Sequence, residues 1–175
     1  MSKIEFEIKD IGCGLKMDKW IDGIQPKNPA GYKKQAEEKV YRDNKKNISI
    51  PAVAIKACMR LASSEVGKKM QAKKNRQTIS SAVFIEPSML PLNKKKYDYI
   101  VEDVVTRGNG SKVTRVKTYR PFVNGWVVKG VINSFGVPIE FIRECLELGG
   151  MRYGLLSHRP EFGRFIITKF QEVKK

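Results

Sequence analysis

Alternating hydrophobic and polar residues mark the strands of this chain. Residues 2–10 place Ile4, Phe6 and Ile8 on one face and mostly charged side chains on the other, which predicts a half-buried strand. The same reading predicts further strands at residues 78–86, 97–106, 113–120, 126–134 and 165–170. A glycine-rich turn separates the second and third of these, so we expect that pair to form a hairpin with an exposed tip.

Apolar residues at helical spacing predict two main helices. The first follows Pro51, a residue suited to a first helical turn, and we expect it to run to Gly67. The second opens at Pro138 and runs to Leu148, with its charged side chains on the outer face. A short polar helix is expected over residues 32–42, within a stretch that glycine and proline often interrupt.

The order of these elements predicts an α+β fold. Residues 11–47 read as an insertion after the first strand, and residues 94–120 as a hairpin extension. Without these two segments the order is β-α-β-β-α-β, the ferredoxin-like arrangement that is also that of RNA-recognition domains. At 175 residues we expect one domain, residues 1–175, with a core of its own.

The charge balance is strongly basic. The chain has 34 Lys and Arg against 18 Asp and Glu, a formal net charge of +16, which favours a polyanionic partner such as nucleic acid. No run of about eighteen apolar residues predicts a membrane span, and the first ten residues lack the apolar core of a signal peptide. We therefore expect a soluble, cytoplasmic protein.

The cysteines do not predict a metal site. Cys13, Cys58 and Cys145 lie far apart, the chain has one histidine, and no Cys-x-x-Cys or Cys/His ligand spacing occurs. We expect reduced thiols, with Cys58 and Cys145 in the core, and neither a metal nor another cofactor.

The most informative stretch is the glycine-rich connection between the second helix and the last strand, LGGMRYGLLSHRPEFGRF. Such connections usually take about two to six residues, and this one is far longer. Gly149 or Gly150 is expected to cap the helix. Gly149, Gly150, Gly154 and Gly163 allow a backbone to approach a ligand, and basic side chains between them would favour an anion. The candidate phosphate contacts there are Arg152, Arg159 and Arg164. The plain alternative is a surface loop with no ligand.

Further basic residues are candidates for the same role. Lys56 and Arg60 project from one side of the first helix, because they are four residues apart. The acid-free tract 68–76 and the second hairpin strand would extend the contact through Lys68, Lys69, Lys73, Lys74, Arg76, Arg115 and Lys117. Aromatic residues among cations suit stacking on unpaired bases, which points to Trp20, Tyr32 and Tyr153.

Two of these stretches resemble a known family. Residues 50–60, IPAVAIKACMR, are similar to the "IPGSSLKGALR" helix start of the RAMP superfamily of CRISPR-associated proteins, and residues 149–165 look like its C-terminal glycine-rich loop. The resemblance implies a ferredoxin-like module that binds RNA, in some members aligned along a guide strand and in some able to cut it. The ending HRPEFGRF also resembles small phage and prophage proteins of unassigned role, which would act in the host cytoplasm.

We therefore expect a protein that binds single-stranded RNA or DNA through the phosphate backbone, with self-association along the strand or a larger ribonucleoprotein as its setting. Two alternatives stay open. One is a phage-type interaction or inhibitor module that docks on a host nucleic-acid complex. The other is a metal-independent RNA endonuclease that uses His158 as general acid or base.

Overall fold

The computed structural model describes residues 1–21, 26–67, 71–109 and 112–173, with side chains left out of the description at 107–114. Its main sheet has four antiparallel strands in the order β4-β8-β1-β9. These are β1 (Ser2–Asp10), β4 (Val83–Glu86), β8 (Val127–Ser134) and β9 (Phe165–Glu172). Central strand β1 shows the predicted alternation, because Ile4, Phe6 and Ile8 are all buried.

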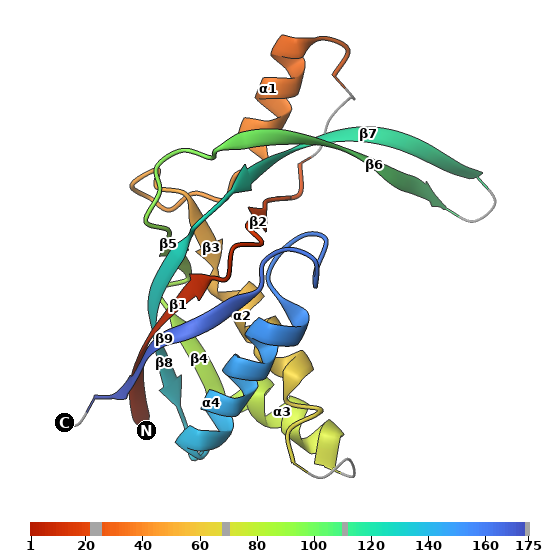
Figure 1. The fold of residues 1–175 in the computed structure, drawn as a ribbon. Coiled ribbons are helices and arrows are strands. Elements are labelled where there is room, and N and C mark those ends of the chain that lie inside the picture. Colours follow the sequence, from red (N-terminus) through yellow and green to blue (C-terminus); the bar gives the residue numbers. More distant parts are fainter. Residues whose placement is uncertain (22–25, 68–70, 110–111, 174–175) are drawn as a thin grey trace.

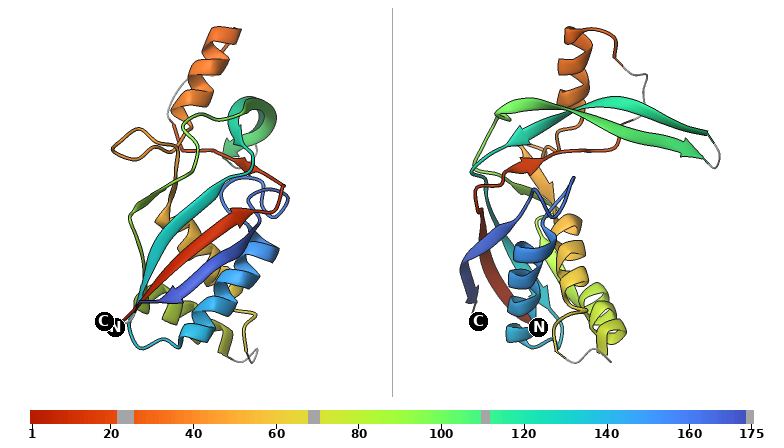
Figure 2. Two further views of the ribbon diagram at one scale, coloured as in Figure 1. Left: turned by 60° about the vertical axis from the view of Figure 1, so that its left-hand side comes forward. Right: turned by 45° about the vertical axis from the view of Figure 1, so that its right-hand side comes forward.

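Two helices cover one face of this sheet (Figures 1 and 2). They are α2 (Ala52–Ala62) and α4 (Ile139–Leu148), with Pro51 and Pro138 at their N-caps as the sequence predicts. Cys58 and Cys145 lie fully buried between helices and sheet. The first helix is shorter than expected, since it ends at Ala62 and turns lead from there to Gly67.

The main sheet and its two helices follow in the order β1, α2, β4, β8, α4, β9. This is the β-α-β-β-α-β order, and the strand order β4-β8-β1-β9 places β1 and β8 in the centre of the sheet and β4 and β9 at its edges. The molecule is therefore an α+β fold with antiparallel sheets, as the periodicity predicts.

One predicted strand is wrong over most of its length. Residues 78–82 belong to a third helix, α3 (Ala72–Ala82), and only β4 is extended. The hydroxyls of Thr78, Ser80 and Ser81 donate to carbonyls four residues earlier, at 2.8–3.0 Å, so these strand-favouring residues are accommodated in a helix. Ile79 is fully buried, which anchors the helix.

A second layer stands apart from the main sheet. Strands β6 (Tyr99–Asn109) and β7 (Lys112–Val123) pair along their whole length, and β2 (Leu15–Lys16) adds to the base of β7. The hairpin is therefore longer than predicted, and it extends well away from the main sheet and from helices α2, α3 and α4 (Figure 1). Helix α1 (Pro29–Glu38) packs on β7 and begins earlier than predicted, at a cap where Gly31 N–H donates to Asn28. Strands β3 (Ser49–Pro51) and β5 (Met89–Pro91) form a separate pair.

None of the helices in the described part of the chain is both long and apolar enough to cross a membrane.

Candidate nucleic-acid interface

The glycine-rich loop begins as a continuation of α4. A single π-helical turn, η2 (Gly149–Tyr153), follows Leu148 directly. Gly149 stands at the predicted capping position but keeps a right-handed conformation, with φ −58° and ψ −48°. A glycine with positive φ comes five residues later at Gly154, where φ is 68° and the chain leaves the helix. Gly149 therefore stands at the C-cap of α4 without the left-handed capping conformation, and Gly154, with ψ −178°, does not adopt that conformation either.

Three of the four loop glycines are required by close backbone packing. A Cβ at Gly150 would lie 2.4 Å from the carbonyl oxygen of Phe165, and one at Gly154 2.7 Å from that of Phe162. A Cβ at Gly163 would lie 2.2 Å from the carbonyl oxygen of Leu155. Their first role is to let the loop fold back on itself and on β9, with no ligand needed to explain them.

Backbone hydrogen bonds close the neck of the loop and attach it to the segment after β1. Leu155 N–H donates to the Gly163 carbonyl at 2.9 Å, and Gly163 N–H donates to the Gly14 carbonyl at 2.8 Å. Ser157 N–H reaches the carbonyl of Lys16 at 3.3 Å. These bonds at Leu155, Ser157 and Gly163 form the neck of the loop and fix the position from which the exposed tip, residues 158–161, projects.

The loop cations differ in their surroundings. Arg159 is exposed and forms no ion pair among the described residues. Arg164 is half-buried, and its Nε has no hydrogen-bond partner in the described structure. Arg152 instead pairs with Glu65, whose other carboxylate oxygen accepts from the Tyr153 hydroxyl. Two of the three arginines are therefore available to an anion, and the third is held by a carboxylate.

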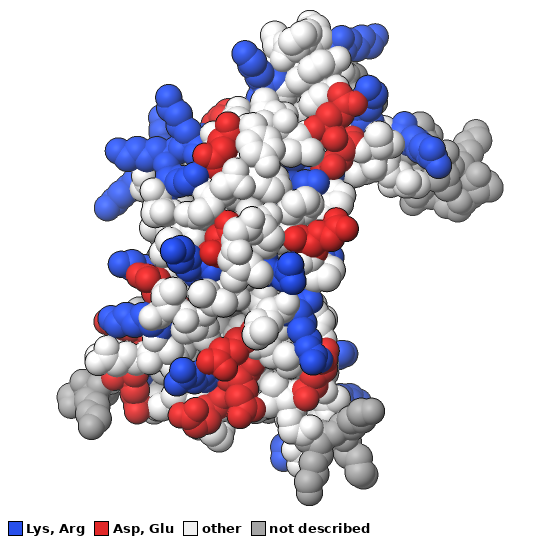
Figure 3. Space-filling model, in the orientation of Figure 1, with Lys and Arg blue, Asp and Glu red and all other residues white. Residues whose placement is uncertain are grey.

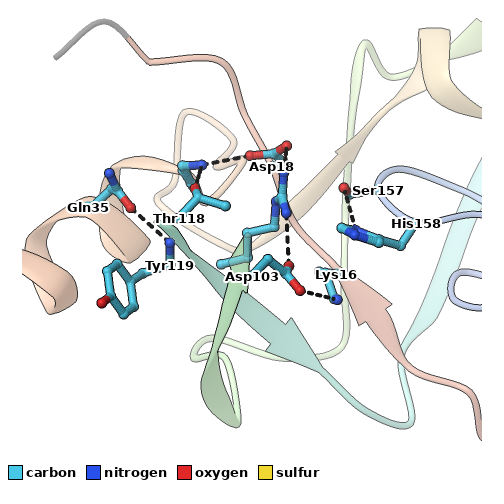
Figure 4. Close-up of polar contacts among 10 residues, drawn as sticks. Lys16, Asp18, Gln35, Asp103, Thr118, Tyr119, Ser157 and His158 are labelled. Atoms are coloured by element: carbon cyan, nitrogen blue, oxygen red, sulfur yellow. Dashed lines mark hydrogen bonds and ion pairs between the residues drawn. The ribbon is translucent and has the colours of Figure 1, made fainter. Parts of the chain in front are cut away.

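His158 lies at the loop tip beside the base of the hairpin (Figure 4). Its Nδ1 is 3.2 Å from the Ser157 hydroxyl. Its backbone is left-handed, with φ 55°. The carboxylate of Asp103 lies near His158, but it already forms ion pairs with Lys16 and Arg120. The catalytic role proposed for His158 stays a prediction.

A buried chain of charges joins the hairpin to the segment after β1 (Figure 4). Asp103 accepts from Lys16 at 3.1 Å and from Arg120 at 2.8 Å, and Arg120 also donates to Asp18 at 2.7 Å. Lys39 completes the chain through Asp18 at 2.8 Å. Burial alone would raise the pKa of Asp103, but hydrogen bonds from Arg120 and Lys16 outweigh it and hold that pKa below its usual value.

Sequence reasoning missed this network, because its members come from distant segments. The residue next to Asp103, Glu102, faces the other way, because successive strand residues alternate: it is exposed and pairs with Lys117 at 2.7 Å. Lys16 and Arg120 are buried although their side chains are charged. The alternation of residues along β7 does not reveal that burial, so it gave no local signal for the network.

The predicted basic residues of α2 and α3 come together. Arg60, Lys73 and Arg76 line an open groove of about 900 Å³ between the two helices. Lys56 Nζ donates to the carbonyl of Ser80 at 2.7 Å, across the same helix pair. Lys74 is exposed on α3 outside the groove lining, and Lys68 and Lys69 lie outside the described residues.

The predicted stacking residues are separated from one another. Trp20 is 75% exposed and borders a cavity of about 230 Å³ that also contacts Lys39, Thr118 and Arg120. Tyr32 stacks on Tyr119 of the hairpin with ring centroids 4.0 Å apart, so one of its faces is already covered. Tyr153 is half-buried and engaged with a carboxylate, while Arg115 is exposed on the hairpin.

On the open face of the main sheet the exposed aromatic residue Phe84 lies on edge strand β4, and the central strands carry charged pairs. Glu5 pairs there with Lys169 at 2.7 Å, and Glu7 with Lys129 at 3.0 Å. RNA-recognition domains stack bases on aromatic residues of this face. The described central strands β1 and β8 present no aromatic side chain on this face.

Surface charge is distributed in patches. Figure 3 shows Lys and Arg interspersed with Asp and Glu over the face in view, without one continuous basic sheet. A strand of nucleic acid would therefore meet local basic clusters, of which the loop and the α2–α3 groove are two.

Comparison with known proteins places the fold. No family model and no curated protein matches the chain. A solved structure does: a chain of the type III-B Cmr-beta complex bound to cognate target RNA, determined by cryo-electron microscopy, has a TM-score of 0.60 and 14% sequence identity. The match covers 99% of this chain and 61% of the other, so this chain spans about three fifths of its length. At this identity the likeness concerns the fold alone.

Proposed function

We propose that this protein binds RNA as a subunit of a CRISPR-type ribonucleoprotein. The observation that carries the proposal is the fold likeness over 99% of the chain to a chain from a complex that contains target RNA. The formal charge of +16 supports it, because a polyanionic partner would neutralise that excess. Single-stranded RNA is the form that we expect the protein to bind.

We read the domain as a ferredoxin-like RAMP core that spans residues 1–175. In this reading residues 11–47 are an insertion after the first strand, and residues 94–120 form the hairpin extension. Both additions lie on the side of the core that carries the glycine-rich loop (Figures 1 and 2). The buried charges Lys16, Asp103 and Arg120 hold these parts together, so the loop and the hairpin base present one surface.

Backbone contacts are the proposed mode of binding. Arg159 and Arg164 of the loop would contact phosphates directly, and Arg152 would join them if it exchanged Glu65 for a phosphate. Lys117 and Arg115 on the hairpin would extend the contact. Contacts of this kind position a strand without reading its sequence, so affinity should depend strongly on salt and weakly on base composition.

The test is binding of a labelled 30-nucleotide single-stranded RNA to the wild type and to an R159A/R164A variant over a series of salt concentrations. Each lost phosphate contact should lower the log–log salt slope by about 0.7, so the variant should lose about 1.4. Single-stranded DNA and duplex DNA of the same length serve as comparisons. Wild-type binding by a well-folded variant would remove the loop from the interface.

A further inference from the structure

The groove between α2 and α3 has a feature that the loop lacks: none of its cations is neutralised. Arg60, Lys73 and Arg76 all line it, and among the described residues none of them forms an ion pair. Elsewhere basic side chains are often paired, as in Lys16 with Asp103 and Arg152 with Glu65. The groove therefore gathers positive charge that the protein itself leaves uncompensated.

Helix α3 carries this charge in an unfavourable place. Its first turn contains Lys73 and Lys74 and no acidic residue, although the positive end of a helix dipole favours anions there. Lys73 and Arg76 are also three residues apart, so their like charges repel on one face. A bound anion would relieve both effects, whereas no feature of α3 itself does so.

The groove is held in shape by bonds between its two walls. Asn75 Nδ2 donates to the carbonyls of Ser63 and Val66, at 3.1 and 2.9 Å, and so satisfies the backbone that follows α2. Arg76 Nη2 donates to the Ser64 hydroxyl at 3.1 Å. Lys56 crosses from the other side to the carbonyl of Ser80. The cations are thus presented from a pre-organised pair of helices.

The lining of the groove favours a phosphate backbone over a protein segment. Between the cations lie Gln77, Ser80 and Ser81, and among the described lining residues the apolar side chains are Leu61 and Ala72. Stable protein interfaces have an apolar core of several aromatic or large aliphatic side chains, and of that kind the described lining contains Leu61 alone. A phosphodiester backbone needs only spaced cations and polar groups.

We infer that the α2–α3 groove is a second binding site for the phosphodiester backbone of single-stranded RNA, separate from the glycine-rich loop. This inference rests on the proposed function, because it gives the same RNA a second contact. Helix α3 lies between α2 and β4 in the chain, outside the β-α-β-β-α-β series. One wall of the groove is therefore an added element, and the other is α2 of the series. The groove and the loop are linked at the end of α2, where Glu65 holds Arg152 and Ser64 holds Arg76.

The experiment compares K73Q/R76Q with a control of equal charge loss, K95Q/K96Q. Lys95 and Lys96 are exposed between β5 and β6 and do not line the groove. Binding of the labelled 30-nucleotide RNA is measured from low to near-physiological salt. K73Q/R76Q should lower the salt slope by about 1.4 and weaken binding roughly tenfold at 0.15 M salt, whereas the control should stay near the wild-type slope. Glutamine is a good helix former, so α3 should remain folded, and circular dichroism checks it.

The outcomes separate this inference from the proposed function. If K73Q/R76Q binds like the wild type while R159A/R164A is impaired, the groove site is overturned and the proposed function stands. If the wild type binds the RNA and neither variant is impaired, the groove site and the loop contacts are both overturned; if the wild type does not bind the RNA, the proposed function fails. If K73Q/R76Q keeps full RNA affinity but loses binding to poly-L-glutamate, the groove serves an acidic protein segment and the RNA site is overturned. Equal losses of RNA affinity in K73Q/R76Q and K95Q/K96Q would show only the effect of net charge. That result would also overturn the groove site.

Discussion

The neck of the glycine-rich loop provides a matched pair of substitutions, G163A and G67A. Both glycines have φ near 76°, so alanine meets the same backbone strain at each. They differ in their surroundings: a Cβ at Gly67 meets nothing within 4 Å, whereas one at Gly163 would lie 2.2 Å from the Leu155 carbonyl oxygen and 2.6 Å from its nitrogen. The difference between the two variants therefore measures how tightly the neck is packed.

The expected magnitudes follow from these contacts. The left-handed conformation costs alanine about 1–2 kcal/mol, and the stiffer unfolded chain returns about 0.4–1 kcal/mol, so G67A should destabilise by about 1 kcal/mol. In G163A the backbone at Leu155 must also move, which loses the 2.9 Å hydrogen bond from Leu155 N–H to the Gly163 carbonyl. That bond contributes about 1 kcal/mol, and displacement of the buried Leu155 side chain costs about 1–3 kcal/mol. G163A should therefore destabilise by about 3–5 kcal/mol.

Urea unfolding followed by circular dichroism measures both free energies of unfolding, and RNA binding is measured beside them. G163A should also bind RNA more weakly, because the loop tip loses its support, while G67A should bind as the wild type does. Equal stabilities of the two variants, within about 0.5 kcal/mol, would refute the reasoning, because a tight neck cannot absorb a methyl group without cost.

Other expectations concern the charged groups. D103N leaves Arg120 with one carboxylate fewer in a buried site, so it should destabilise by about 3 kcal/mol in thermal or urea unfolding, whereas E102Q at the exposed neighbouring position should stay close to wild type. Because the folded pKa of Asp103 is held low, its contribution is present above about pH 4 and is lost as the pH falls through the folded value. Stability should thus decline below about pH 4 and decline less steeply in D103N; an identical acid profile would contradict this. E65Q frees Arg152, so it should tighten RNA binding and raise the salt slope by about 0.7, and weaker binding would count against that role of Arg152.

Local periodicity was enough to predict much of the fold. The alternation of β1, the long hairpin and the helices that start after Pro51 and Pro138 all appear near their expected positions. In each of them one face is apolar and the other polar, so burial of one face follows from the residues of that element alone. The order of the elements along the chain also agrees with the prediction, since β1, α2, β4, β8, α4 and β9 follow one another as expected once the added segments are left out.

The tertiary structure decided what local patterns could not. Residues 78–82 are helical because α2 supplies a surface for Ile79 and the hydroxyls bond within the helix, although their sequence favours a strand. Whether an arginine is free or paired also depends on distant residues: Arg152 meets Glu65 across 87 positions of sequence, while Arg76 meets no carboxylate in the described structure. The sequence alone determined that the chain is basic and where its cations lie in the chain. Only the fold decided which of them remain available to an anion, because ion pairing depends on distance in space, and a sequence specifies distance only between near neighbours.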